Sequence, residues 1–457
     1  MTAPKDRTLL LLGASGDLAK RYLLPGLGAL VATGEVAGIS LIGAGTQTWD
    51  DERWRTTVAR AFASTGARGG DVDAVIRGAR YLPADVTADA DLRRLLDAVR
   101  GELILYFALP PAVTRRCCEV LATIGLPPGT RMVMEKPFGT DAASARALNQ
   151  LLASMVPEER IFRVDHFLAM HTVLDLFGLR FANRIVEPLL TNEHVARVDI
   201  FSDESLGLED RAVYYDKAGA LVDVTQNHLL QVLALFAMDA PAELEGCEVR
   251  ERKATLLRAT HVWDDDPVTW SRRGRYTAGT IDGRSLPSYV DERGVDPARN
   301  TETFAEIVLA VDTPRWKGVP FYLRNGKALR ALNRSLVVTF RDPPRMPGGL
   351  TGERRPNRLV VGLEPSGLAL DLTINGPGDA RSLDPVTLRA EVAPSTIPEY
   401  GEVLRSVLAG DPTLFVGGDM AVESWRIVEP VLTAWKANQV PLQDYEAGGE
   451  GPASRCS

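Results

Sequence analysis

The first third of the chain alternates short apolar runs with stretches in which apolar residues recur every three or four positions. This alternation is typical of βαβ units, which build a parallel sheet covered by helices. The pattern predicts strands over residues 8–12, 39–42, 81–83, 103–108 and 131–134, and helices over residues 17–30, 114–124 and 142–152. We therefore predict an α/β domain in this part of the chain.

Beyond about residue 170 the pattern changes to several strand-like runs with few helices between them. The runs predict strands over residues 198–201, 304–311, 321–323, 336–340, 358–363 and 368–374, and helices over residues 228–238 and 400–409. Consecutive strands of this kind predict an α+β domain with a large, mainly antiparallel sheet. We expect two domains, 1–170 and 171–457, and a frayed Gly- and Ala-rich tail over residues 446–457.

Composition narrows the class of protein. A chain of 457 residues is too long for one ordinary core, and its apolar and charged fractions, 45% and 25%, are those of a globular protein. A net charge of −8 argues against nucleic acid as a partner. The most apolar stretch, residues 229–238, is about half the length of a membrane span, and no signal peptide is recognisable. We expect a cytoplasmic protein with no membrane partner.

The four cysteines, Cys117, Cys118, Cys247 and Cys456, have neither the spacing of a metal site nor that of a disulfide framework. We therefore expect reduced cysteines and no metal.

A glycine turn follows the first predicted strand. Gly13-Ala14-Ser15-Gly16-Asp17-Leu18 separates that strand from the first helix. Glycines let a backbone turn tightly and approach a pyrophosphate, whose charge is stabilised by the amides of a helix N-terminus. A tight strand-to-helix turn also needs glycine without any ligand. Its place on the first strand of a βαβ run favours a dinucleotide site.

Three further polar segments are candidates for chemistry. Lys136 lies in Glu135-Lys136-Pro137-Phe138-Gly139 at the end of a predicted strand, the edge of a parallel sheet at which ligands bind. Asp165 and His166 lie in one polar segment, and Asp223 and His228 lie in another. A histidine that is oriented by a carboxylate suits the removal of a hydroxyl proton. A surface lysine and buried, hydrogen-bonded histidines are the structural alternatives.

Taken together, these segments resemble the glucose-6-phosphate dehydrogenase family. The matching stretches are GASGDLAKR (13–21), FALPP (107–111), EKPFG (135–139), RVDHF (163–167), LRFANRIVEPL (179–189), DVTQNHLLQ (223–231) and LRNGKAL (323–329). They extend over most of the chain in a fixed order, and the match is weakest in the last hundred residues or so. The resemblance implies a Rossmann-type N-terminal domain, a C-terminal α+β domain whose large sheet forms a subunit interface, and a homodimer or homotetramer.

The resemblance also implies an activity and a set of roles. The reaction is oxidation of a hexose phosphate at C1 to the δ-lactone, with hydride transfer to NADP or NAD, in the pentose phosphate pathway. His228 matches the general base, Asp165 the carboxylate that orients it, and Lys136 a lysine near sugar and nicotinamide. Substrate contacts match Lys136, His166, Glu204, Asp223 and Lys327, and cofactor contacts match Gly13, Ala14, Ser15, Gly16, Asp17, Leu18, Thr46, Gln47, Leu109, Pro110 and Lys136.

Several positions depart from the family pattern. Phe167 and Met170 stand where relatives carry a tyrosine and a lysine that bind the substrate phosphate, and Leu332 stands at a further basic position. Thr46 stands where relatives that favour NADP carry an arginine, so we expect weak cofactor selectivity or a preference for NAD. An unphosphorylated or modified aldose as substrate, or a catalytically weak nucleotide-binding regulatory paralog, are the alternatives that these departures leave open.

Overall fold

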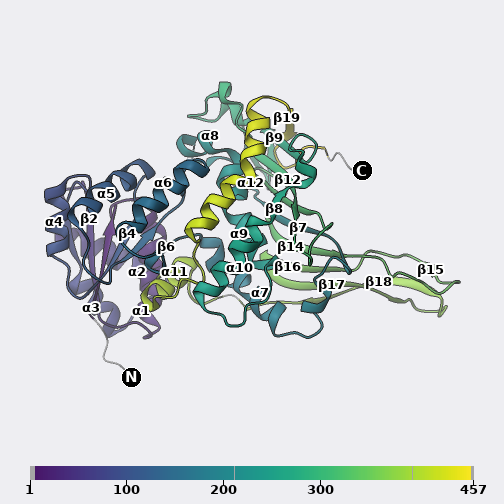
Figure 1. Ribbon diagram of the computed structural model, residues 1–457, viewed down its shortest axis with the longest axis horizontal. Helices are drawn as coiled ribbons and strands as arrows, with labels where there is room; N and C mark the ends of the chain where they lie inside the picture. The colour runs from purple at the N-terminus through teal and green to yellow at the C-terminus, as the bar shows by residue number, and fades with distance from the viewer. Residues whose placement is uncertain (1–5, 210–211, 394, 454–457) are drawn as a thin grey trace. The chain divides into compact units, whose positions relative to one another are not determined.

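The computed structural model describes residues 6–209, 212–393 and 395–453, and Cys456 lies outside them. The chain divides into two compact units (Figure 1). Unit 1 consists of Met1–His171, Pro241–Ala254 and Ser395–Val422, and unit 2 consists of Thr172–Ala240, Thr255–Pro394 and Glu423–Ser457. Unit 1 is therefore built from three separate stretches of sequence.

The centre of unit 1 is a sheet of six parallel strands. In chain order they are β1 (Arg7–Leu12), β2 (Ile39–Gly45), β3 (Arg80–Pro83), β4 (Glu102–Phe107), β5 (Arg131–Met134) and β6 (Ile161–Arg163). Their order across the sheet is β3-β2-β1-β4-β5-β6, and every neighbouring pair is parallel. Most residues of β1 and β4 are buried, which explains why these strands read as continuous apolar runs. The parallel α/β domain predicted from the sequence is confirmed.

Helices cover this sheet in two groups (Figure 1). The first group is η1 (Ala19–Leu23), α1 (Leu24–Ala32), α2 (Asp51–Ala63) and α3 (Gly70–Gly78), which contact one another, and the second is α4 (Asp89–Asp97), α5 (Pro111–Ile124) and α6 (Ala142–Ala153). The short helices η2 (Glu158–Arg160) and η3 (His166–Ala169) flank β6. The arrangement is that of a doubly wound α/β domain.

A segment from late in the sequence completes the core of unit 1. The predicted helix over 400–409 is α11 (Glu399–Ala409), and it packs against α1. The two helices approach closely because both carry glycine at the crossing: a Cβ on Gly26 would lie 2.6 Å from the amide nitrogen of Gly401. Leu404 and Leu408 of α11 join the apolar cluster formed by the first βαβ units.

Unit 2 contains a large mixed sheet, most of whose pairs are antiparallel. Its strands are β7 (Val195–Asp203), β8 (Thr260–Val262), β9 (Ser271–Thr277), β12 (Phe304–Val311), β13 (Phe321–Gly326), β14 (Asn333–Phe340), β15 (Thr351–Gly352), β16 (Arg358–Glu364), β17 (Ser366–Asn375), β18 (Ser382–Ala390) and β19 (Leu442–Glu446). The order is β15-β18-β17-β16-β14-β7-β13-β12-β9-β19, with β8 beside β12. Strands β10 (Gly279–Ile281) and β11 (Arg284–Leu286) form a separate hairpin. The predicted α+β architecture with a mainly antiparallel sheet is confirmed.

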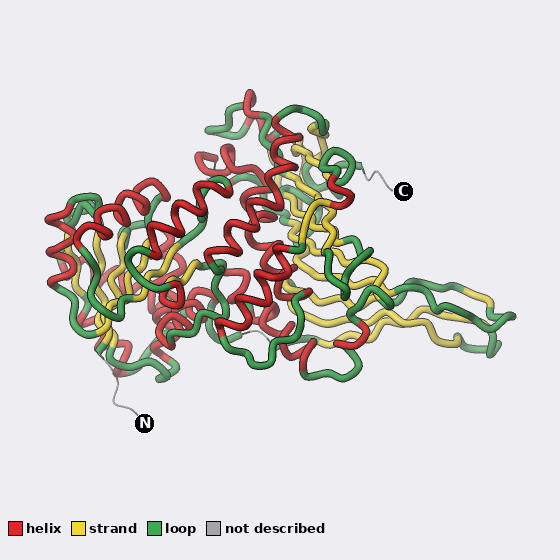
Figure 2. The backbone as a smooth tube through the Cα atoms, in the orientation of Figure 1, coloured by secondary structure: helices red, strands yellow, loops and turns green. Residues whose placement is uncertain are grey.

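The β17–β18 end of this sheet extends as a long arm (Figure 2). At the opposite edge, the part of the segment after β19 that the structure describes is held by backbone hydrogen bonds, although the sequence predicts a frayed tail over residues 446–457. The amide of Gly448 donates to the carbonyl of Ala328 at 2.8 Å, and the amide of Arg330 donates to the carbonyl of Gly449 at 2.9 Å. These backbone hydrogen bonds hold a segment whose composition alone predicts mobility.

The remaining helices of the described chain include α7 (His171–Phe181), α8 (Ala212–Ala220), η6 (Leu221–Leu229), α9 (Leu230–Ala237), α10 (Gly246–Arg258) and α12 (Gly418–Lys436), together with the short helices η4 (Glu187–Leu189), η7 (Trp263–Asp265), η8 (Tyr289–Asp291) and η9 (Pro297–Arg299). The helical stretch Tyr214–Ala237, which is kinked at Gly219, is long and apolar enough to cross a membrane, but 83% of its most apolar window is buried inside the protein. That degree of burial is characteristic of a core helix.

Candidate active site

The turn after β1 is held between the ends of two neighbouring strands. The amides of Gly13 and Ala14 both donate to the carbonyl of Ala44 at the end of β2, at 2.8 and 3.0 Å. Gly13 has φ +84°, and a Cβ there would lie 2.1 Å from the carbonyl oxygen of Ala108, just after β4. Glycine is therefore required at position 13 both for its backbone conformation and for the space it leaves.

The cofactor residues predicted from the sequence all follow the carboxyl ends of adjacent strands. The strand order reverses between β1 and β4, and dinucleotides bind outside the carboxyl ends of strands at such a point. The helix that begins at Asp17 directs its first amides toward this edge, where they suit a pyrophosphate. Gly13, Ala14, Ser15, Gly16, Asp17 and Leu18 follow β1, Thr46 and Gln47 follow β2, and Leu109 and Pro110 follow β4. The residues present fit a dinucleotide.

Lys136 lies beyond the end of β5, beside a buried acid. The Lys136–Pro137 peptide bond is cis, and the adjacent Glu135 accepts a hydrogen bond from the hydroxyl of Tyr106 at 2.5 Å. Burial raises the pKa of Glu135 to about 7, although the charge of Lys136 opposes this shift. Glu135 and Tyr106 give the edge of the sheet a hydrogen-bonded pair that lies next to the predicted catalytic lysine.

Asp165 begins the short helix that carries His166. The Asp165 side chain is buried and accepts a hydrogen bond from the amide of Phe167 at 3.0 Å, as an N-cap residue does. The His166 ring lies nearly parallel to the ring of Tyr400, with centroids 6.2 Å apart. Phe167 and Met170, the two positions at which the sequence departs from the expected family pattern, are both buried.

In unit 2, two parallel strands bring a predicted pair of sugar-binding residues together. Glu204 follows β7 and Lys327 follows β13, and the Lys327 Nζ lies 2.6 Å from Glu204 Oε2. Arg334 of β14 donates to the other Glu204 oxygen at 2.9 Å. Burial alone would raise the pKa of Glu204, but the two cations outweigh it and hold this pKa below its ordinary value. Glu204 is therefore an ionised hydrogen-bond acceptor.

Asp223 and His228 lie on η6, a helix whose start is firmly anchored. Gly219 has φ +70° and breaks the preceding helix, and the amide of Leu221 then donates to Glu302 Oε1 at 3.1 Å. One turn later Thr225 accepts a hydrogen bond from the Asn325 side chain at 2.6 Å, which ties η6 to β13. Both Asp223 and His228 are buried.

The protonation of Glu302, which holds the start of η6, should make the stability of the protein depend on pH. Burial raises its pKa from 4.5 to about 7, so the folded state favours the protonated form. The stability that this preference contributes is present below pH 4.5 and is lost as the pH rises through 7. Glu302→Gln, which cannot ionise, should therefore gain stability relative to wild type between pH 5 and pH 8, by at most about 3 kcal/mol. Thermal unfolding of both proteins across this range measures the difference, and a constant difference would contradict the shift.

The predicted site residues are divided between the two units. Unit 1 holds the cofactor turn, Lys136, Asp165 and His166, and unit 2 joins Glu204 to Lys327 and carries Asp223 and His228. Sequence reasoning missed Arg334, because only the pairing of β14 with β7 shows that it reaches Glu204. It also missed Lys253 of α10, which is fully buried and whose pKa is lowered by that burial to about 7. A lysine on a buried helix face is the one signal that would have revealed it.

Comparison with known proteins agrees with this arrangement. The family model described as "Glucose-6-phosphate dehydrogenase, NAD binding domain" matches residues 10–175, and that described as "Glucose-6-phosphate dehydrogenase, C-terminal domain" matches residues 177–456. The glucose-6-phosphate 1-dehydrogenase of Bacillus subtilis (strain 168) is 36% identical, with 97% of this chain and 94% of that protein covered. That of Gluconobacter oxydans (strain 621H) is 38% identical, with 96% and 93% covered.

A solved structure also matches nearly the whole chain. It is a glucose-6-phosphate dehydrogenase in complex with its substrate glucose-6-phosphate, with a TM-score of 0.90, 28% identity, and coverage of 99% of this chain and 97% of that one. The fold and the nucleotide turn define an oxidoreductase that uses NAD or NADP. More narrowly, the chain belongs to the glucose-6-phosphate dehydrogenase family. Its reaction is the oxidation of a hexose phosphate at C1 to the δ-lactone, a step of the pentose phosphate pathway.

Proposed function

We propose that His228 is the general base of this reaction and that Asp165 orients it. As the C1–H bond breaks, the C1 hydroxyl gives its proton to the imidazole of His228, and a C1=O bond forms in the lactone. Bound NADP or NAD supplies the hydride acceptor. Both residues lie in motifs that match the family, which supports these roles. The hydrogen bond from the amide of Phe167 to Asp165, and that from Asn325 to Thr225 on the helix of His228, also support them, because they fix the elements that carry the two side chains. Asp165 stabilises the imidazolium that forms, as a carboxylate does for a catalytic histidine.

The observation that carries the substrate assignment is the Lys327–Glu204 pair. A lysine 2.6 Å from an ionised, half-buried glutamate provides a donor and an acceptor side by side, which suits neighbouring sugar hydroxyls. Asp223 supplies a further acceptor, and Lys136 contacts both the sugar and the nicotinamide. His166 contacts the substrate phosphate. We propose glucose 6-phosphate as the substrate, held with fewer phosphate contacts than in relatives because Phe167 and Met170 are apolar.

A panel of sugars tests the proposed function. The purified protein is assayed with glucose 6-phosphate, other hexose phosphates and free glucose, each with NADP and with NAD. Glucose 6-phosphate should give the highest kcat/KM. A preference for a free aldose would favour the alternative substrate class, and cofactor binding without turnover of any sugar would favour a regulatory paralog.

Substitution of Thr46 tests the prediction that this residue lies beside the 2′-phosphate of bound NADP. A threonine hydroxyl offers one neutral hydrogen bond, whereas an arginine fork gives a phosphate two charge-assisted bonds. Thr46→Arg should therefore raise kcat/KM for NADP about tenfold relative to NAD. Steady-state kinetics with both cofactors measure the ratio, and Thr46→Gln serves as a control of similar length without charge. A ratio that does not change would show that residue 46 lies away from the 2′-phosphate.

We further propose a homodimer or homotetramer that assembles through the large sheet of unit 2. Half-buried apolar residues cover strands β16 to β18, and Leu388 and Ile374 are 56% and 52% exposed there. An apolar patch of this kind on a sheet is typical of a subunit interface. Light scattering of the wild type and of Leu388→Lys should show dissociation of the variant.

We also propose a cytoplasmic location, which the free thiols of Cys117 and Cys118 support.

A further inference from the structure

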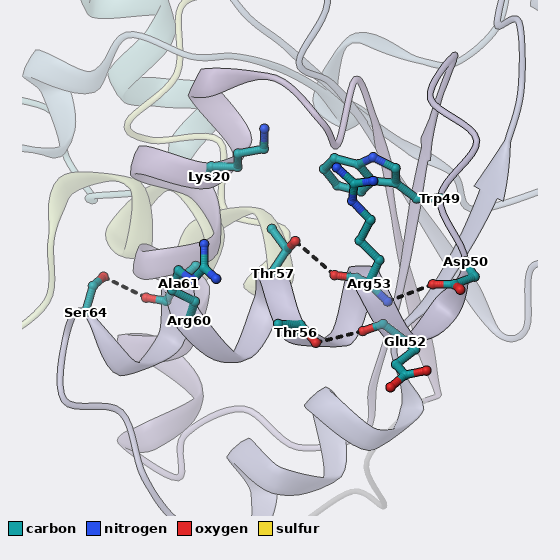
Figure 3. A pocket seen from close by; sticks show the side chains of 10 residues that line it. All are labelled: Lys20, Trp49, Asp50, Glu52, Arg53, Thr56, Thr57, Arg60, Ala61 and Ser64. Carbon is teal, nitrogen blue, oxygen red and sulfur yellow. Dashed lines mark hydrogen bonds between the residues drawn. The ribbon is translucent and has the colours of Figure 1, made fainter.

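Lys253 is a lysine whose side chain lies entirely inside the protein. Its exposed fraction is 0%, and among the residues that the structure describes its Nζ has no hydrogen-bond partner. In the same unit, Lys20, Arg53 and Arg60 line a pocket of about 760 Å³ beside α2 (Figure 3), and none of these three is buried. Because burial of an amine without a partner costs stability, the position of Lys253 points to a functional role.

The helix that carries Lys253 packs against the strand that leads to Asp165. Arg250 lies one turn before Lys253 on α10, so the two side chains share a face of the helix. The guanidinium of Arg250 donates to the carbonyl of Ile161, the first residue of β6, at 2.9 Å. Asp165 follows the end of β6 by two residues. The face of α10 that bears Lys253 is therefore held against the strand that positions Asp165.

The acid whose charge acts on Lys253 is Asp165. Burial lowers the pKa of Lys253 to about 7, the charge of Asp165 opposes this shift, and the charge of Arg250 adds to it. Glu158, by contrast, is engaged by two arginines, because its carboxylate accepts from Arg163 at 2.7 Å and lies 4.0 Å from Arg250. Lys253 and Asp165 are therefore a buried cation and a buried anion within electrostatic reach of each other.

Two acidic side chains share the surroundings of Asp165. Burial raises the pKa of Glu135 to about 7 and that of Tyr400 above its ordinary value, and the charge of Asp165 adds to both shifts. Such couplings are mutual, so an ionised Glu135 also disfavours the ionised form of Asp165. The neighbouring titratable group on the same short helix is His166. A buried cation nearby therefore contributes directly to keeping Asp165 ionised.

We propose that Lys253 is a positioning residue for the general base: its buried ammonium holds Asp165 in the ionised form, in which the carboxylate orients His228. The inference rests on the proposed function, because it concerns the same acid–base pair. In this role Lys253 acts through Asp165 and not on the sugar or the cofactor. At alkaline pH a carboxyl group is ionised without help, so the contribution of Lys253 is confined to the acidic side of the activity profile.

The test is the pH dependence of kcat/KM for glucose 6-phosphate in the wild type and in Lys253→Met. Methionine is similar to lysine in length and carries no charge, so protonation of the Asp165–His228 pair becomes easier and the acidic limb should move to higher pH. A move of about one pH unit lowers kcat/KM about tenfold on that limb, whereas the two enzymes should agree within about twofold at pH 9.

Arg252→Met is the matched control. It removes an equal charge from the same helix, but Arg252 is exposed and pairs with Glu248 at 3.0 Å, so the profile should not change. Thermal unfolding at pH 9 excludes a loss of structure. Lys253→Met should unfold there at or above the wild-type temperature, because the substitution removes a buried amine that has no hydrogen-bond partner.

Magnetic resonance of labelled histidine gives a readout that does not need turnover. The signal of His228 is assigned by its absence from His228→Asn, and in Lys253→Met the pair should take up its first proton at a higher pH than in wild type.

Superimposable profiles of wild type and Lys253→Met would overturn the inference, as would a shift that Arg252→Met reproduces or a Lys253→Met protein less stable than wild type. The proposed function fails in a different way: no sugar is oxidised, whatever the histidine titration shows. An enzyme that oxidises glucose 6-phosphate with the same profile in both proteins keeps the function and loses the inference.

Discussion

His228→Asn should lower kcat by about 10²–10⁴-fold, the usual worth of a general base. Asparagine keeps a polar side chain on η6 but cannot take the C1 hydroxyl proton in the range of pH where imidazole does. Because the cofactor turn lies in unit 1, and His228 in unit 2, nucleotide binding should stay close to that of wild type. Steady-state kinetics with glucose 6-phosphate, together with nucleotide titration of the same preparation, measure both effects.

Two companion variants sharpen this prediction. Asp165→Asn should also be slow, because the amide removes the charge that stabilises the imidazolium, and its pH profile should shift as the base titrates differently. His261→Asn is the matched control, since the ring of His261 contacts Asp265 and Asp312 and lies in neither polar cluster. A His228→Asn enzyme with wild-type turnover would remove the assignment of the base.

Glucose 6-phosphate should have a KM about 100-fold higher here than in a relative that carries the tyrosine and the lysine. Each charge-assisted hydrogen bond is worth about 1.5–3 kcal/mol, and Phe167 and Met170 remove two potential partners of the phosphate. Phe167→Tyr/Met170→Lys should therefore lower the KM for glucose 6-phosphate substantially while leaving the KM for free glucose near its wild-type value. The comparison of the two substrates isolates the phosphate from the sugar ring.

Because Phe167 and Met170 are buried, the stability of the variants shows whether Met170 faces the phosphate or only packs in the core. If Met170 only packs against neighbouring apolar groups, a lysine there is desolvated without a partner and the variant should lose stability. If it faces the phosphate, bound glucose 6-phosphate should restore that stability by mass action. Phe167→Leu/Met170→Leu, which keeps the wall apolar, should change neither KM. A micromolar KM in the wild type that the double change does not improve would contradict the prediction.

The sequence predicts five of the six strands of the parallel sheet of unit 1, because strands such as β1 and β4 are buried and read as short apolar runs between turns, and it misses the short strand β6. The antiparallel strands β12 and β16 are equally clear, since each alternates or is continuously apolar. What the sequence does not show is the return of residues 395–422 to unit 1. Residues about 375 positions apart meet there through Gly26 and Gly401, and neither glycine differs locally from one in any helix.

The site residues likewise divide into those that a local motif predicts and those that only the pairing of distant strands brings together. Residues within one motif, such as Gly13 and Asp165, can be proposed from local patterns because a turn or a cap has its own sequence signature. The partners of Glu204 cannot be, because Lys327 and Arg334 come from two other strands whose register decides which side chains meet. Leu332, which stands where the resemblance implies a further basic residue, is 38% exposed, and Arg334 two residues later donates to Glu204.

The most direct test of the account is the transfer of deuterium from glucose 6-phosphate labelled at C1. The purified protein is incubated with the labelled sugar and NADP, and the reduced cofactor and the sugar product are identified by mass spectrometry. We expect one deuterium in the reduced nicotinamide for each lactone or hydrolysed acid formed, with a slower rate than for the unlabelled sugar when hydride transfer limits turnover. Reduced cofactor without deuterium, or no reduction with either NADP or NAD, would contradict the account.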